Sequence, residues 1–174
     1  MFSRPKSYWK LIVYVIFTLV CFVLQSVPAF GVRFLGCAPS LLLLLAVAIA
    51  FFESPNFAGW FGLIAGILAQ LTTSKLVGTD GILLMFSCYI LSVFLETIFR
   101  RKFIVYLFSA LVVLLLQQGA DYLYHLLLFE QLPLGEALVH QILPTFCFSG
   151  LFAFPIYYII WRSDLKFRAK EELE

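Results

Sequence analysis

Three polar residues share one helical spacing within a long apolar stretch between residues 103 and 129. Gln117, Asp121 and His125 recur at every fourth position, so a helix places them on one face. Ionisable residues within an apolar helix must be paired or hydrated, and in membrane proteins they often mark a proton or substrate path. The spacing predicts a polar intramembrane face, which is either a small binding site or an Asp–His pair that fixes helix packing.

Small residues recur at helical spacing in another apolar segment, residues 57–74. The stripe comprises Ala58, Gly62, Ala65, Gly66 and Ala69, and Gln70 continues it. Small side chains let two helix backbones approach closely, which is one source of packing energy between helices in lipid. We predict that the stripe packs inside this chain's own bundle or, as an alternative, against another chain or a ligand. A buried amide at Gln70 needs a hydrogen-bond partner on a facing helix.

Catalytic and metal-binding motifs are missing from the sequence. It contains no HExxH, GxSxG or Walker pattern. Its four cysteines show no CxxC spacing, and three of them lie within the apolar segments. The sequence therefore predicts a protein that is not an enzyme and that carries no metal or cofactor.

The composition indicates the kind of fold that holds these residues. The chain has 174 residues, of which 63% are hydrophobic and 13% are charged, whereas about 25% are charged in ordinary globular domains. A water-soluble surface cannot be built from so few charges. This excludes a soluble enzyme core, a nucleic-acid-binding surface and a large domain outside the membrane.

Six apolar segments lie between clusters of charged residues. They predict an all-α integral membrane protein, in which residues 1–174 form a single polytopic domain, a bundle of about six transmembrane helices. The second segment is the shortest. The predicted segments are Trp9–Phe30, Pro39–Phe52, Phe57–Ser74, Gly81–Phe99, Phe103–Phe129 and Ala137–Trp161.

The basic residues set the predicted orientation. In an alternating six-helix model, ten of the twelve lysines and arginines fall on the side that holds both termini. Because short cytoplasmic loops are enriched in Lys and Arg, we expect both termini in the cytoplasm. As an alternative, Arg4, Lys6 and the apolar run 11–24 form a signal peptide that is cleaved near Ala29, which leaves five helices in the same orientation.

The order of these features resembles the family of the bacterial rod-shape-determining protein MreD. Pro39 opens a leucine-rich segment, Gly62-x3-Gly66-x3-Gln70 follows after a loop, and Gly78 precedes the next apolar segment. The six-helix size, the short loops and the basic tail are also similar to that family. In the family the glycine-spaced helix commonly runs on into an aspartate, where this chain has Gln70.

The resemblance implies a non-enzymatic scaffold of the bacterial cytoplasmic (inner) membrane. Such a scaffold serves the cell-elongation complex, which makes peptidoglycan and determines rod shape. The implied partner is a bitopic membrane protein similar to MreC, within a complex that includes MreB filaments, a RodA-type polymerase and a class B penicillin-binding protein. Membrane lipid is the expected surrounding, and nucleic acid is not an expected partner.

The resemblance also suggests an alternative function. The MreD fold is thought to be similar to the substrate-binding S components of energy-coupling-factor vitamin transporters. S components characteristically dock through small residues on their first helix, whereas residues 11–24 are mostly large in this chain. The face of Gln117, Asp121 and His125 is the feature that favours the transporter alternative.

Overall fold

The computed structural model describes residues 8–26, 40–71, 79–97, 103–129 and 143–171. Within these ranges the regular structure is entirely helical, which confirms the all-α prediction. The helices are α1 (Tyr8–Ser26), α2 (Leu41–Phe52), α3 (Pro55–Leu71), α4 (Thr79–Thr97), α5 (Phe103–Phe129) and α7 (Leu143–Glu171).

The observed helices differ from the predicted segments mainly at their ends. α5 has the predicted bounds, while α3 begins two residues earlier than predicted, at Pro55. Proline suits the first turn of a helix, where its missing N–H has no intrahelical partner. α7 continues ten residues beyond the predicted end at Trp161, as far as Glu171. Pro39, the predicted start of the second segment, lies outside the described residues.

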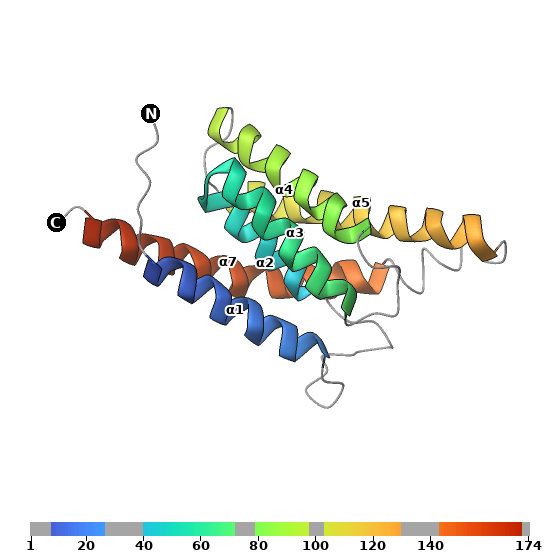
Figure 1. The fold of residues 1–174 in the computed structure, drawn as a ribbon, viewed down its shortest axis with the longest axis horizontal. Helices are drawn as coiled ribbons and strands as arrows, with labels where there is room; N and C mark the ends of the chain where they lie inside the picture. Colours follow the sequence, from blue (N-terminus) through green and yellow to red (C-terminus); the bar gives the residue numbers. More distant parts are fainter. Residues whose placement is uncertain (1–7, 27–39, 72–78, 98–102, 130–142, 172–174) are drawn as a thin grey trace.

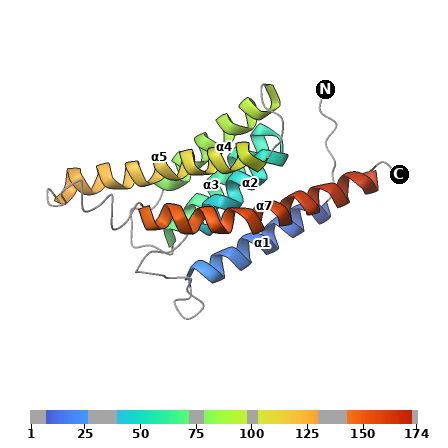
Figure 2. The same cartoon turned by 180° about the vertical axis from the view of Figure 1, so that it is seen from behind.

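α2 is the central helix of the bundle. All twelve of its residues are buried, and it packs against each of the other five described helices. It runs between the α3–α4 pair and α7 in both views (Figures 1 and 2). Its sequence, LLLLLAVAIAFF, has no polar side chain on any face, which is the pattern of a helix that is buried all round.

Side chains from other helices satisfy the backbone at both ends of α2. The N–H of Ser40 lies 3.4 Å from Ser149 Oγ of α7, and the N–H of Leu42 lies 3.4 Å from Gln25 Oε1 of α1. At the other end, Ser92 Oγ of α4 donates to the carbonyl of Glu53 at 2.9 Å. The first N–H groups and last carbonyls of a helix have no partner within the helix itself. Neighbouring helices therefore provide hydrogen-bond partners for the backbone groups at the ends of the short α2.

Consecutive helices alternate in direction, so the start of α1 and the end of α7 lie at the same end of the bundle (Figure 1). Every helix except α2 exposes large apolar side chains on its outer face, such as Ile16, Trp60, Phe86 and Phe108. By length and composition, one stretch of the described chain, Phe103–Leu123, could cross a membrane unaided. The other apolar stretches are shorter and comprise Lys10–Ser26, Leu41–Phe52, Pro55–Leu71 and Thr79–Leu95.

Candidate functional site

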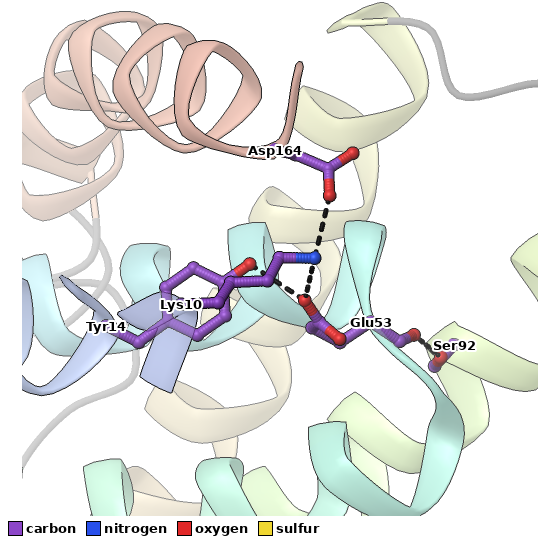
Figure 3. A network of polar contacts seen from close by, with 5 residues as sticks. All are labelled: Lys10, Tyr14, Glu53, Ser92 and Asp164. Carbon is purple, nitrogen blue, oxygen red and sulfur yellow. Dashed lines mark hydrogen bonds and ion pairs between the residues drawn. The ribbon is translucent and has the colours of Figure 1, made fainter. Parts of the chain in front are cut away.

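Three charged residues from distant parts of the chain meet at the end of the bundle where α1 starts (Figure 3). Lys10 Nζ of α1 lies 2.6 Å from Glu53 Oε1, just after α2, and 2.9 Å from Asp164 Oδ1 of α7. The three side chains are 11%, 18% and 5% exposed, respectively. Charged groups that leave water are retained when they are paired and hydrogen-bonded, and this arrangement meets that condition.

Two hydroxyl groups extend this charged network. Tyr14 OH donates to Glu53 Oε1 at 2.9 Å, and Ser92 Oγ donates to the main-chain carbonyl of Glu53. Lys10 and Tyr14 are four residues apart, so both project from the same face of α1. Glu53 is the hub, since its side chain binds α1 and its carbonyl binds α4 (Figure 3). Glu53 thus joins the end of α2 to α1 and α4, and Lys10 adds α7 through Asp164.

A layer of aromatic rings also packs around the end of α2. Tyr157 of α7 contacts Phe51, Phe52, Phe103 and Tyr106 with ring centroids 5.0–6.2 Å apart. Tyr106 is fully buried, and its hydroxyl donates to the main-chain carbonyl of Leu44 at 3.2 Å. These rings pack α5 and α7 against the same end of α2 to which Glu53 is attached.

The small-residue stripe of α3 lies against α4 of the same chain. A Cβ atom added at Gly66 would lie 2.6 Å from the Cα of Gly81, and one added at Gly62 would lie 2.8 Å from the carbonyl oxygen of Leu84. These two helices thus touch backbone to backbone. Of the remaining predicted positions, Ala58, Ala65 and Gln70 are buried and Ala69 is half-buried.

The amide of Gln70 also binds within the chain. Its Nε2 donates to Thr79 Oγ1, at the start of α4, at 3.2 Å. Gln70 is 1% exposed, so this contact provides a polar partner for a group that has left water. At this position, the stripe contributes to α3–α4 packing.

The polar face of α5 lies elsewhere in the bundle. Gln117 and Asp121 are half-buried and continue the face of α5 that carries the buried Tyr106, Ala110 and Leu114. Gln117 Oε1 is buried and has no hydrogen-bond partner in the part of the chain that the structure describes. His125 lies within α5, but its side chain is outside the described residues.

The polar face and the charged network are separate sites. Gln117 lies fourteen residues along α5 from Phe103, where the helix starts at the network end, a rise of about 20 Å at 1.5 Å per residue. Within the described ranges, no three His, Cys, Asp or Glu side chains come together as a possible metal site. The chemistry of the charged network is that of hydrogen bonds and ion pairs between helices.

The charged network was not predicted from the sequence, where Lys10, Glu53 and Asp164 look like separate charges in loops and tails. A signal was nevertheless present. In the alternating six-helix model, the start of the first helix, the second loop and the tail after the last helix all lie at one end. Lys10 and the two carboxylates at that end have opposite charges, so an ion pair among them is consistent with the sequence.

Comparison with known proteins adds no family assignment. No family model, no curated protein and no solved structure matches the chain.

Proposed function

We propose that this chain is a polytopic protein of the bacterial cytoplasmic membrane with both termini in the cytoplasm. The outer surface of the bundle supports this placement, since α1, α3, α4, α5 and α7 all expose large apolar side chains. Monomeric soluble proteins rarely expose continuous apolar patches larger than a few hundred Å². In a membrane, the lipid tails surround these same apolar side chains, so their exposure has no cost. α2 is too short to cross alone, but it is enclosed by the other helices.

We further propose that the protein is a non-enzymatic scaffold similar to MreD, which binds a bitopic MreC-like partner in the cell-elongation complex. The observation that carries this proposal is the use of the polar residues in helix–helix contacts. Lys10 pairs with Glu53 and Asp164, and Gln70 pairs with Thr79. A scaffold acts through a rigid bundle with defined lateral surfaces, and these contacts provide that rigidity.

Depletion of the protein from a rod-shaped host tests this function. We expect cells to become round and wide while vitamin uptake stays intact. Purification in mild detergent should bring down an MreC-like bitopic protein, and this association should be insensitive to ATP. Unchanged cell width on full depletion would contradict the scaffold proposal.

The S component of a vitamin transporter remains the second candidate because of one observation. Gln117 Oε1 is a buried acceptor with no partner among the described residues, and a ligand that donates a hydrogen bond would satisfy it. If this function is correct, depletion abolishes growth on a trace vitamin, and the protein co-purifies with an ATPase-linked coupling subunit. These outcomes differ from those of the scaffold proposal.

A further inference from the structure

α1 is held less extensively than the other helices of the bundle. It buries one narrow stripe, formed by Tyr14, Thr18 and Cys21. Val13, Phe17 and Phe22 beside this stripe are half-buried, and Phe17 and Phe22 pack against the core. The outer face of α1 is exposed and consists of large apolar residues, namely Leu11, Ile12, Val15, Ile16, Leu19, Val20, Val23 and Leu24. Its neighbours are mainly α2 and, to a smaller extent, α3.

In lipid, an apolar stripe of this kind provides little attachment. Lipid tails are as apolar as leucine, so helix association depends on close packing and on polar contacts between helices. The described polar contacts of α1 with other helices lie at its two ends. Lys10 and Tyr14 bind Glu53 and Asp164 at one end, and Gln25 accepts a long hydrogen bond from Leu42 at the other. Thr18 donates to its own helix.

We propose that Lys10, Glu53 and Asp164 form an electrostatic latch, and that α1 is a separable helix whose docking depends on the charge of Lys10. One ammonium group is shared by two carboxylates that belong to different parts of the bundle. Without the ammonium group, these carboxylates repel each other, and Tyr14 alone keeps α1 bound to Glu53. The network end of α1 then moves away from α2 into lipid.

Loss of the Lys10 charge would therefore change the conformation of the bundle. It would uncover the surface of α2 that α1 covers. The proposal rests on the proposed membrane placement but is independent of the scaffold function. A distance measurement in purified protein tests it, while cell shape tests the function, so either can fail without the other.

The experiment measures the distance between spin labels on α1 and α5 in lipid nanodiscs. Labelled cysteines replace the exposed residues Leu19 and Phe108 in the full chain, with the four native cysteines changed to alanine. Lys10→Met removes the charge and keeps the chain length, whereas Lys10→Arg keeps the charge. Arg162→Met is the matched control, because it removes an exposed cation of α7 near Asp164.

We expect one narrow distance distribution for the labelled protein that keeps Lys10, Glu53 and Asp164. The Lys10→Arg and Arg162→Met variants should give the same distribution. Lys10→Met should add a second population at longer distance. Asp164→Asn should add a smaller one, because Lys10 keeps Glu53 as a partner. If the Lys10→Met variant does not accumulate in cells, the Asp164→Asn variant is used in its place. It should then show the second population at longer distance. The proposal is overturned if the latch variants keep the original distribution, or if the two control variants shift as much as Lys10→Met.

Discussion

At the scale of single residues, Glu53 has the largest number of partners in the charged network. Its position directly after α2 lets its carboxylate reach α1 while its carbonyl reaches α4. The charged side chain of Glu53 therefore contributes to the contacts that hold the helices together. Replacement of a hydrogen-bond donor next to it should affect stability more than the loss of an identical group on the outer surface.

The hydroxyl of Tyr14 provides this test. Tyr14→Phe removes the hydrogen bond to Glu53 and leaves the ring contacts with Phe57 and Phe61 in place. We expect a loss of about 1.5–3 kcal/mol in the free energy of unfolding, the typical contribution of a hydrogen bond to a charged group. Reversible unfolding in mixed micelles measures it.

Tyr89→Phe is the control for this substitution, since Tyr89 of α4 is 44% exposed. We expect its free energy of unfolding to stay close to that of the unmodified protein. Equal effects of the two substitutions would mean that the Tyr14–Glu53 hydrogen bond contributes nothing to stability.

The members of the network could be predicted only in part from the sequence. Chain order and alternation place Lys10, Glu53 and Asp164 at one end of the bundle. They do not give the rotation of α1 or α7 about its own axis, which decides whether Asp164 or the neighbouring Arg162 faces inward. Asp164 is buried and Arg162 is exposed. This choice depends on packing of all the helices together.

At the scale of helices, the α3–α4 pair depends on the absence of two side chains. A Cβ at Gly66 would meet the backbone of Gly81 and Asp80 at 2.6–2.9 Å, and a backbone cannot rotate out of the way. We expect Gly66→Ala to destabilise the bundle by about 1–3 kcal/mol, the usual cost of overpacking. Thermal unfolding in detergent measures the effect.

Gly59→Ala, on the same helix, is the matched control. Its new Cβ would find its nearest atom at 3.6 Å, in the side chain of Tyr89, which is ordinary contact. Alanine also favours a helix over glycine by about 0.5–1 kcal/mol, so we expect unchanged or slightly higher stability. If Gly66→Ala were tolerated as well as Gly59→Ala, the close approach of α3 and α4 would not limit stability.

The central position of α2 shows where prediction from the sequence fell short. The sequence predicts this segment as the shortest of six membrane helices but does not predict that the other five described helices all pack against it. A run of 10–14 apolar residues is more typical of a buried core helix than of a membrane span. The length of α2, twelve residues, was a usable signal. By contrast, α5 combines a long apolar run with charged residues just before it, so its bounds could be predicted.

At the scale of the whole molecule, the proposed topology makes opposite predictions for two exposed positions. Thr79, at the start of α4, should face the outside, and Arg162, in the C-terminal part of α7, should face the cytoplasm. In intact cells, a membrane-impermeant thiol reagent should label cysteine at position 79 and fail at position 162. Native Cys37 is replaced first because the topology predicted from the sequence assigns it to an outer loop.

Labelling at both positions after cell lysis is the control for accessibility. If position 162 reacted in intact cells, the arrangement with both termini in the cytoplasm would be wrong, whichever function the protein has. The contact between Lys10 and Asp164 would then lie on the outer side of the membrane, and the positive-inside argument from the basic residues would fail with it.

The way in which α2 is capped has a consequence for biosynthesis. One of the side chains at its N-terminus, Ser149, is 109 residues further along the chain than Ser40. At 1.5 Å per residue, α2 is about 18 Å long, so in a membrane about 30 Å thick its N-terminus lies within the hydrocarbon. On a nascent chain Gln25 of α1 is made before this end, but the N–H of Ser40 gains its contact with Ser149 only when α7 emerges from the ribosome. The core helix, although made second, is among the last to complete its contacts.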